Sequence, residues 1–378
     1  MKIEKLYPAC KSIIWGGEKL KKYYGKETEL SPLAETWELS LHEAGKSTLS
    51  DGRPLSEVAE KSDFGANCEG FPFFPVLVKF IDANAKLSIQ VHPEDDFALK
   101  NENSLGKTEM WYIVSADEGA GIYLGFNRDI TPDEFENAIK NQTLTDYLNF
   151  IPVKAGECYF IPAGTIHAIC EGCLICEIQQ NSNITYRVYD YGRKDKDGNE
   201  RELHVEKAIQ VTKLQQYEKQ ESVDAFLGAS KYFTAQKVEI DGETTLFSDE
   251  QSFRHLACVE GCGSIDGIKI SQGDSFFVPA GYGNYTLSGK MTVITTEIRK
   301  YYLSVDRNDG GVVCAVKNDL GQIVVSANTN SDLLISCAKE LLKRVNMTCG
   351  DLEYAVVGGD IKIAEEISKK LGIMVKNK

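Results

Sequence analysis

Short runs of alternating or continuous apolar residues, separated by glycine and proline turns, dominate the first 300 residues. The segment ETWELSL (35–41) has the composition of a half-buried strand, and the apolar run 76–81 follows the turn-rich FPFFP segment (71–75). Similar short strands separated by glycine turns fill residues 221–300. This pattern predicts a mostly β protein built from antiparallel sandwiches or barrels.

Helical patterns appear in one segment of this β-rich region and again after residue 300. Residues 131–149 combine an N-cap candidate, Thr131, with Glu134 three residues later, which predicts a helical insertion. Beyond residue 300 we expect strands at 301–316 and 321–326, a turn at 318–321, a helix at 331–345, a strand at 354–357 and a helix at 361–371. This order marks a separate, small α/β unit.

One internal repeat links two distant parts of the chain. The segments GECYFIPAGTIH (156–167) and GDSFFVPAGYGN (273–284) place glycines and a proline at the same spacings. Each predicts a glycine turn, a strand and a Pro-x-Gly turn that directs one side chain into a barrel mouth. The first segment ends in His167 and the second in Asn284, so only the first offers a metal ligand.

These patterns together predict a fold and a division of the chain. We expect two cupin (jelly-roll-like) barrels with a helical insertion, followed by the α/β unit. The expected domains are 1–220 with the metal site, 221–300 as a metal-free barrel, and 301–378 as an appendage.

Four residues of the first predicted barrel suggest a metal site. Gln90 and His92 share one face of a strand because strand side chains alternate. Glu109 stands where another strand begins, and His167 ends the repeat. Two imidazoles, one carboxylate and one amide oxygen suit Zn²⁺ in an open, catalytic site. The other three histidines, at positions 42, 204 and 255, lack comparable settings and are expected to be structural.

The net charge and the length of the apolar runs narrow the possible binding partners and cellular locations of the protein. The chain has 378 residues and a net charge of −14, which argues against nonspecific binding to nucleic acid or anionic membranes. No apolar run approaches the roughly 20 residues that span a bilayer. The first ten residues, MKIEKLYPAC, lack the apolar core of a signal peptide. We therefore expect a cytoplasmic protein.

The eleven cysteines fit the same compartment, since reduced, packed thiols are usual there. Cys170, Cys173 and Cys176 have a spacing that also suits a zinc knuckle. The intervening Glu171 and Gly172 favour a strand, a tight turn and a second strand, so we interpret the three cysteines as hairpin residues.

Six segments of the first 210 residues carry a resemblance to a known family: TWELS (36–40), FPVLVKFIDANAKLSIQVHPEDD (74–96), GKTEMWYI (106–113), VKAGECYFIPAGTIHAI (153–169), EIQQNSNITYRVYDYGR (177–193) and RELHVEKAI (201–209). They resemble the type I phosphomannose isomerases, in particular their short bacterial branch. The resemblance implies one zinc ion per chain and a phosphosugar substrate, with mannose 6-phosphate and fructose 6-phosphate interconverted through a cis-enediol. Oligomeric state is left open.

The resemblance also implies roles for single residues. The zinc ligands fall on Gln90, His92, Glu109 and His167. The active-site lysine falls on Lys107, the active-site arginine on Arg187, and a polar position associated with the substrate phosphate on Ser88.

Lys107 is a candidate base if the metal lowers its pKa, and a zinc-linked group is the alternative. Glu109 suits the role of base less because ligation blunts its basicity. Arg187 stays protonated and suits stabilisation of the enediolate or phosphate. Lys79 is a further phosphate candidate, with a solvated strand position as the alternative.

Other functions and metals remain open. His92, Glu109 and His167 would also satisfy an Fe(II) cupin oxygenase, and a cupin that binds sugar without catalysis is a third class. Co²⁺ and Mn²⁺ are alternatives to Zn²⁺. Residues 301–378 resemble the start of an actin-like sugar kinase through Asp306 and Gly310-Gly311, but we interpret them as a non-catalytic appendage.

Overall fold

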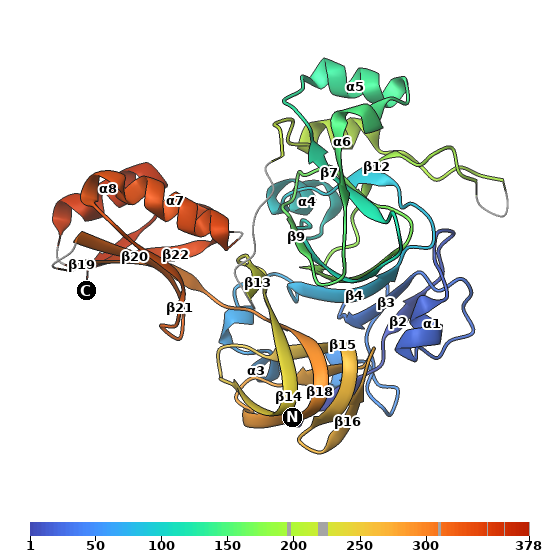
Figure 1. The fold of residues 1–378 in the computed structure, drawn as a ribbon, viewed down its shortest axis with the longest axis horizontal. Helices are drawn as coiled ribbons and strands as arrows, with labels where there is room; N and C mark the ends of the chain where they lie inside the picture. The colour runs from blue at the N-terminus through green and yellow to red at the C-terminus, as the bar shows by residue number, and fades with distance from the viewer. Residues whose placement is uncertain (195–197, 218–225, 309–310, 346, 359, 378) are drawn as a thin grey trace.

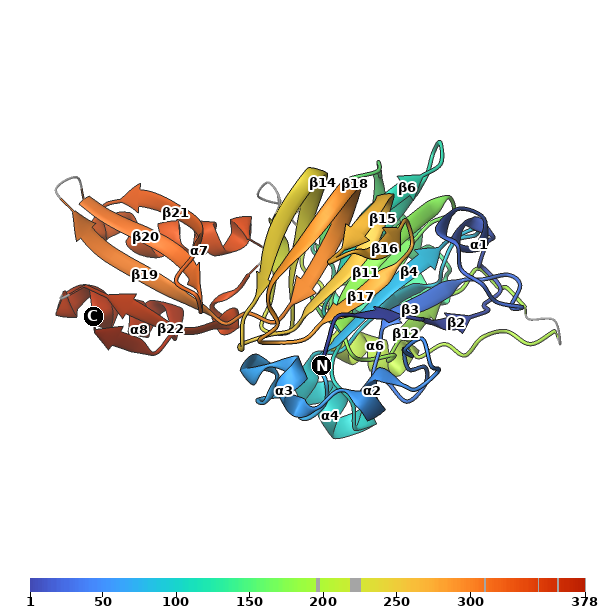
Figure 2. The same ribbon diagram turned by 90° about the horizontal axis from the view of Figure 1, so that it is seen from below.

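The computed structural model describes residues 1–194, 198–217, 226–308, 311–345, 347–358 and 360–377. They form a first cupin unit (residues 9–211), a second cupin unit (residues 4–6 and 226–297) and a C-terminal unit (residues 301–377). The two cupin units pack against each other and the C-terminal unit projects to one side (Figures 1 and 2). No helix in the described ranges is long and apolar enough to cross a membrane.

Two antiparallel sheets enclose the core of the first cupin unit. One sheet has the order β2 (Ala9–Lys11), β3 (Glu35–Leu39), β4 (Val76–Asp82), β11 (Cys173–Gln180), β6 (Glu109–Ala116), β9 (Cys158–Ile161). The other has the order β12 (Tyr186–Tyr189), β5 (Ile89–Val91), β10 (His167–Ile169), β7 (Gly121–Phe126), β8 (Leu148–Pro152). Trp111 and Ile175 of the first sheet share a buried core with Ile122 and Leu124 of the second.

Strand β4 shows how the two cupin units join. All seven of its residues are buried, because both faces of its sheet are covered. Val78 and Phe80 share a core with Phe253 of the second unit, while Ile81 belongs to the core of the first. A strand covered on both faces requires a nearly continuous apolar sequence, and VLVKFID meets this requirement apart from its two charged residues.

A single seven-stranded sheet forms the second cupin unit. Its path is β1 (Glu4–Leu6), β17 (Ser275–Val278), β15 (Arg254–Ile265), β18 (Gly283–Glu297), β14 (Thr234–Ser248), β13 (Phe226–Ala229), with β16 (Ile268–Ser271) paired to β15. The predicted cupin fold is confirmed, as open sheets rather than closed barrels. The division into 1–220, 221–300 and 301–378 stays a proposal, in which β1 completes the sheet of the second unit.

The internal repeat has the same backbone conformation at both sites. Gly156 and Gly273 have φ of 89° and 90° before strands β9 and β17, and Gly164 and Gly281 have φ of 87° and 71° after them. These left-handed conformations favour glycine because other residues have a Cβ that clashes there. At Gly273 an added Cβ would also lie 2.2 Å from a backbone oxygen of Tyr24.

The predicted insertion at 131–149 is helical only over its first half. Helix α5 (Pro132–Lys140) begins at the Thr131–Glu134 capping box and ends at Asn141. The 3₁₀ helix η2 (Leu144–Tyr147) and strand β8 follow. Helix α5 packs beside α6 (Val205–Val211) over the five-stranded sheet (Figure 1). The other helices are α1 (Lys19–Tyr24), α2 (Leu55–Val58), α3 (Lys61–Phe64), η1 (Ala66–Cys68) and α4 (Asp95–Glu102).

The three closely spaced cysteines lie at a turn between two strands, as expected. The turn at 170–172 joins β10 to β11, but these strands belong to opposite sheets and do not pair, so the segment is not a hairpin. Cys170, Cys173 and Cys176 are buried free thiols. Burial raises the pKa of Cys170 to about 11, so the neutral thiol predominates at neutral pH.

The C-terminal unit has the predicted α/β character. Its sheet has the order β21 (Ile323–Thr329), β20 (Gly311–Asn318), β19 (Tyr301–Asn308), β22 (Leu352–Val357), β23 (Val375–Asn377). Residues 301–316, expected as one strand, are divided between β19 and β20, and Gly310 lies outside the described residues. Two helices cover one face of the sheet, α7 (Leu334–Arg344) and α8 (Ile361–Leu371), with short 3₁₀ turns η3 (Ser331–Leu333) and η4 (Cys349–Asp351) (Figures 1 and 2).

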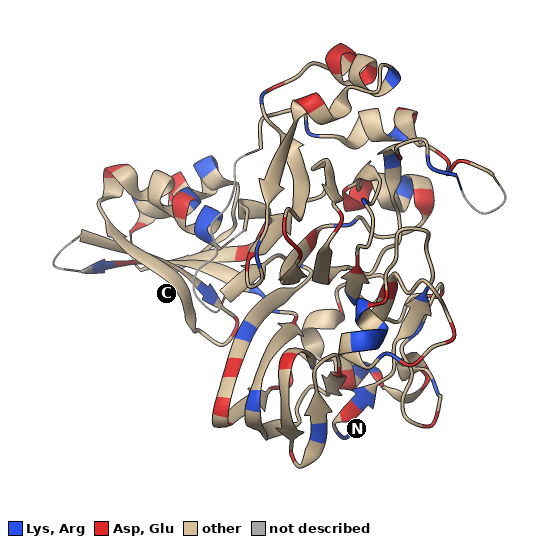
Figure 3. Ribbon diagram, turned by 45° about the vertical axis from the view of Figure 1, so that its right-hand side comes forward, with Lys and Arg blue, Asp and Glu red and all other residues tan. Residues whose placement is uncertain are grey.

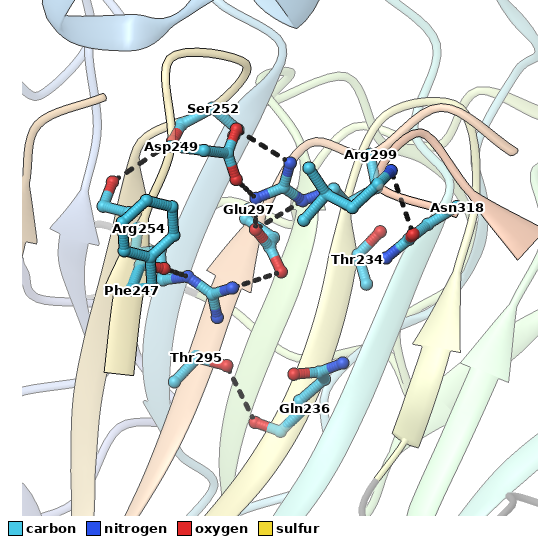
Figure 4. A network of polar contacts seen from close by, with 12 residues as sticks. Thr234, Gln236, Phe247, Asp249, Ser252, Arg254, Thr295, Glu297, Arg299 and Asn318 are labelled. Atoms are coloured by element: carbon cyan, nitrogen blue, oxygen red, sulfur yellow. Dashed lines mark hydrogen bonds and ion pairs between the residues drawn. The ribbon is translucent and has the colours of Figure 1, made fainter. Parts of the chain in front are cut away.

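A buried arginine joins the second cupin unit to the C-terminal unit. Arg299 is 2% exposed and lies between Glu297 and Asp249, as Figure 4 shows. Its Nε donates to Glu297 at 2.7 Å, its Nη1 donates to Asp249 at 3.1 Å, and the same Nη1 lies 3.6 Å from Asp319 of the C-terminal unit. Asn67 Nδ2 donates a hydrogen bond to Asp319 Oδ2 at 2.7 Å. Together these contacts fix the β20–β21 turn against the cupin core.

Candidate functional site

Three predicted ligands meet between the two sheets of the first cupin unit. His92 directly follows β5, His167 begins the neighbouring strand β10, and Glu109 begins β6 of the opposing sheet. Their ligand atoms lie within 4.8 Å of one another, and all three residues are buried. His92 Nε2 is 3.5 Å from Glu109 Oε2, and His167 Nε2 is 3.3 Å from Oε1.

The second nitrogen of each imidazole decides which atom faces the carboxylate. His92 Nδ1 lies 2.7 Å from the carbonyl oxygen of Ile184, and His167 Nδ1 lies 2.9 Å from that of Thr165. A carbonyl only accepts, so each Nδ1 carries the proton and each Nε2 presents its lone pair. Burial lowers the pKa of His167 to about 4, and burial followed by the charge of Lys107 lowers the pKa of His92 far below its ordinary value.

The buried carboxylate of Glu109 is only partly satisfied by hydrogen-bond donors. Its Oε1 has no hydrogen-bond donor among the residues that the structure describes. Burial raises the pKa of Glu109, and the neighbouring charge of Lys107 only partly opposes this. Two imidazole lone pairs facing an undersatisfied carboxylate fit a divalent cation, because a cation would stabilise the ionised form of the carboxyl.

Gln90 is close enough to be a fourth ligand. It is the cross-strand partner of His167 in the β5–β10 pair, and its Nε2 lies 3.5 Å from His167 Nε2. The amide oxygen and nitrogen exchange places by a rotation of the terminal group, so the carbonyl oxygen can face the same point. All four predicted ligands are therefore brought together.

Lys107 lies beside the ligands rather than at a distance from them. Its buried ammonium is 2.6 Å from Glu109 Oε2 and 3.1 Å from His92 Nε2. Burial disfavours the charged form, but Glu109 and Glu177 more than offset it, so the pKa of Lys107 is raised. The protein neighbours of Lys107 thus favour the ammonium, and the expected lowering of its pKa depends on the charge of a bound cation.

Glu177 and Glu35 join this site although the sequence did not suggest them. The ammonium of Lys79 is buried, 3.4 Å from Glu177 and 3.5 Å from Glu35, and is not a solvated strand position. Trp111 Nε1 donates to Glu177 Oε2 at 2.9 Å. Burial opposes ionisation of Glu177, yet Lys107 and Lys79 outweigh it and lower its pKa.

The sequence contains a feature that marks the pair of Lys79 and Glu177. Glu177 is the only charged residue of the fully buried strand CLICEIQQ, and Lys79 interrupts the buried strand VLVKFID. The two residues are direct partners in the β4–β11 register. A charged residue inside an otherwise apolar run indicates a buried partner, and the strand register identifies that partner.

A cleft of about 160 Å³ leads away from Gln90 and Lys107. Ser88, Arg187 and Arg201 line it, together with Lys79, Glu35 and Glu177. Arg187 Nε donates to Ser88 Oγ at 3.2 Å, and Nη1 donates to the carbonyl oxygen of Glu202 at 2.9 Å. The predicted residues Ser88 and Arg187 are therefore in contact.

A network centred on Asp95 holds the segment that carries Lys107. Asp95 Oδ1 accepts bonds from Gly106 N at 2.9 Å and from Gln180 Nε2 at 2.8 Å. Gln180 Oε1 in turn accepts from Thr108 N at 2.8 Å. On the far side, the hydroxyl of Tyr232, in the second cupin unit, donates to Asp95 Oδ2 at 2.6 Å. The backbone on both sides of Lys107 is thus fixed.

Comparisons with known proteins agree with this architecture. A family model described as "Phosphomannose isomerase type I, catalytic domain" matches residues 3–115, and one described as "Mannose-6-phosphate isomerase, cupin domain" matches residues 222–298. The "Probable mannose-6-phosphate isomerase GmuF" of Bacillus subtilis (strain 168) is 37% identical over 303 residues, covering 75% of this chain and 95% of that protein. The mannose-6-phosphate isomerase of Streptococcus mutans is 35% identical over 300 residues, covering 75% and 94%.

Solved structures show the same relationship. The crystal structure of mannose 6-phosphate isomerase from Bacillus subtilis has a TM-score of 0.70 and 34% identity, covering 78% of this chain and 99% of that one. A phosphomannose isomerase from Salmonella typhimurium shares the fold at 17% identity, with a TM-score of 0.64 and coverage of 78% and 99%. Family models, sequence relatives and solved structures agree, and the chain belongs to the type I phosphomannose isomerase family.

Proposed function

We propose that this chain is a divalent-metal-dependent isomerase that interconverts mannose 6-phosphate and fructose 6-phosphate. The relatives named for this reaction support the substrate. The observation that carries the metal dependence is the pair of buried Nε2 lone pairs, fixed by carbonyl bonds at Nδ1, that face the undersatisfied carboxylate of Glu109. Gln90, His92, Glu109 and His167 would hold one Zn²⁺ per chain.

Isomerisation through a cis-enediol moves a proton between C1 and C2, so the site must move protons and stabilise negative charge. A bound divalent cation supplies electrostatic stabilisation of the enediolate oxygens. Arg187 stays charged and would bind the enediolate or the phosphate from the cleft wall. Lys107 and Glu177, 3.8 Å apart, both line the cleft and are side-chain candidates for proton transfer, beside a group linked to the metal.

Metal analysis with an activity assay tests the proposal. Purified protein should contain about one zinc per chain, turn over mannose 6-phosphate in a coupled assay, lose this activity to a chelator, and regain it with Zn²⁺, Co²⁺ or Mn²⁺. Full turnover after complete metal removal would contradict the metal role. Iron with oxygen consumption and no isomerisation would favour the alternative oxygenase, and sugar binding without any turnover would favour a binding protein.

Two variants separate the proton-transfer candidates. Lys107→Ala should lower kcat by about 10² to 10⁴-fold while metal content stays near one per chain. Lys107→Met preserves more volume if the alanine variant folds poorly, and the exposed Lys154→Ala is the control. Glu177→Gln retains the bond from Trp111 while removing the charge. Unchanged kcat in either variant removes that residue from the proton path.

The cellular setting remains part of this proposal. All eleven cysteines are free, which suits a reducing cytoplasm. The substrate is a small phosphosugar, and the net charge of −14 does not favour nucleic acid as a partner. Residues 301–378 are proposed to be a non-catalytic appendage, and neither family model extends beyond residue 298.

A further inference from the structure

The turn between strands β13 and β14 of the second cupin unit lies against the C-terminal unit. Ala229, which ends β13, is fully buried in the core of the C-terminal unit, and the hydroxyls of Thr234 and Tyr301 lie 2.6 Å apart. In the turn itself, the backbone N–H of Lys231 donates to Asp351 Oδ1 at 3.0 Å. Acidic and basic residues are interspersed along all three units (Figure 3), so individual contacts rather than opposed charged faces account for this junction.

The same turn contacts the candidate site of the first cupin unit on its other side. Tyr232, which follows Lys231 in the turn, is 7% exposed, and its hydroxyl donates to Asp95 Oδ2 at 2.6 Å. Asp95 Oδ1 accepts from the backbone N–H of Gly106, which directly precedes Lys107. The turn at 230–233 therefore connects the C-terminal unit to the segment that carries Lys107.

Asp351 is oriented by contacts within its own unit. It completes the capping box of η4, in which its Oδ2 accepts from the backbone N–H and the hydroxyl of Thr348, both at 2.7 Å. Its Oδ1 accepts from Lys231. Asp351, Tyr232 and Asp95 also line one cavity of about 270 Å³, and side chains beside a cavity lack packing contacts on that side. Hydrogen bonds therefore contribute more than close packing to the position of the turn on this side.

We propose that Asp351 is a positioning residue for isomerisation, so that the C-terminal unit supports turnover without touching the substrate. It acts through the turn at 230–233 and Asp95 on the segment that carries Lys107. This inference rests on the proposed function. The ammonium of Lys107 lies 2.6 Å from Glu109, and a small displacement of its segment would misplace it relative to the metal ligands, which lowers turnover. Neither family model extends beyond residue 298, so this support comes from outside the residues that they match.

A double-mutant cycle in the full chain tests this role. Asp351→Ala should lower kcat for mannose 6-phosphate by about two- to fivefold, with metal content unchanged and KM within about twofold of wild type. In a Tyr232→Phe background the same substitution should change kcat by less than about 1.5-fold, because the connection is already broken. Asp351→Asn keeps one acceptor oxygen and should restore part of the loss. The control is Glu365→Ala, which removes an exposed carboxylate of helix α8 and should leave kcat unchanged.

Amide hydrogen exchange gives a second readout that does not depend on activity. Exchange at the backbone N–H of Gly106 should be at least about threefold faster in Asp351→Ala than in Glu365→Ala, with melting curves checking that both variants fold. Equal exchange in these variants, equal kcat in wild type and Asp351→Ala, or additive losses of kcat in the double variant would overturn the inference. If wild type fails to isomerise mannose 6-phosphate, the proposed function fails, and hydrogen exchange still decides whether Asp351 holds this segment.

Discussion

The two cupin units contain the same turn–strand–turn segment, but the residue that ends it is buried in the first unit and exposed in the second. In the first unit the segment ends in His167, which is fully buried and faces Glu109. In the second it ends in Asn284, which is exposed. The glycine conformations on either side of the strand are nearly the same in both units. The backbone of the repeat therefore does not decide whether a unit carries chemistry.

The interior of the second unit explains what replaces a metal site. Phe253 and Phe277 stack there with ring centres 5.5 Å apart, and buried His255 lies 2.5 Å from the hydroxyl of Ser275. The group of metal-type ligands found among the described residues lies in the first unit. Unsatisfied buried polar atoms occur in both units, among them Nδ1 of His255 in the second and Oε1 of Glu109 in the first, so they do not distinguish the two interiors. The feature that separates the two interiors is the convergence of two imidazoles and a carboxylate on one point in the first unit.

The largest expected effect comes from exchanging the residues that end the two repeat segments. His167→Asn removes a ligand, and turnover should fall by more than about 100-fold, since losing even an outer partner of a ligand costs about 10- to 100-fold. Asn284→His should bind no second metal, because position 284 is exposed and faces no carboxylate cluster. Metal content and kcat measure both effects, and a gain of a second metal in Asn284→His would contradict the explanation.

Removing the buried arginine should destabilise the protein without altering its activity per folded molecule. Arg299→Met leaves Asp249, Glu297 and Asp319 without their shared cation, and the free energy of unfolding should fall by about 3–5 kcal/mol. Denaturant unfolding measures this loss. The kcat per folded molecule should stay within about twofold of wild type, because the network in Figure 4 lies outside the cleft. An unchanged midpoint would show that the junction needs no buried charge.

Acid should destabilise the second unit through its buried histidine. Burial lowers the pKa of His255 to about 3, so between that value and about 6.5 the unfolded chain binds a proton that the folded chain excludes. Stability should therefore fall as the pH falls through this range, by up to about 1.4 kcal/mol per pH unit for this histidine. His255→Gln does not titrate, so its unfolding free energy should depend less on pH in metal-free protein. Equal slopes for both proteins would contradict this assignment.

The smallest expected effect concerns the contact between the units. Tyr232→Phe removes the hydroxyl that bonds Asp95 but keeps the ring, and should cost about 1 kcal/mol of stability. Because Asp95 also holds the backbone beside Lys107, kcat should fall by about two- to fivefold while metal content is unchanged. A control is Tyr282→Phe, whose hydroxyl bonds Asp266 on the exposed side of the second unit. Equal kcat for both variants would show that the contact only stabilises the fold.

Local patterns were sufficient where a single segment determines its own structure. Helix α8 begins and ends where the sequence predicts, because Asp360 caps its start and Gly372 ends it in a left-handed conformation. The helix predicted at 131–149 was too long, since the chain turns at Asn141 and Gln142, where Gln142 has φ of 58°. Polar residues at such a turn do not break a helical pattern as visibly as glycine or proline does.

The residues of the candidate site also divide into those that the sequence could predict and those that it could not. The four ligand positions could be predicted because each lies in a short segment with its own spacing, and the structure brings them together. Glu177 and Arg201 could not, because their place depends on which strands pair and in what register. The sequence leaves Lys79 with two interpretations, a phosphate ligand or a solvated strand position. Its real partners are not visible in the sequence because the carboxylates that neutralise it come from strands about 45 and 100 residues away.

The short strand β1 has a consequence for synthesis of the chain. Leu6 pairs with Ser275, so during synthesis strand β1 waits for about 270 further residues before its partner exists. At typical elongation rates this delay is roughly 15 to 50 seconds. During it the edge at β17 does not yet exist, and residues 4–6 are available to chaperones or to other chains. The sheet of the second cupin unit is therefore completed only after Ser275–Val278 have been made.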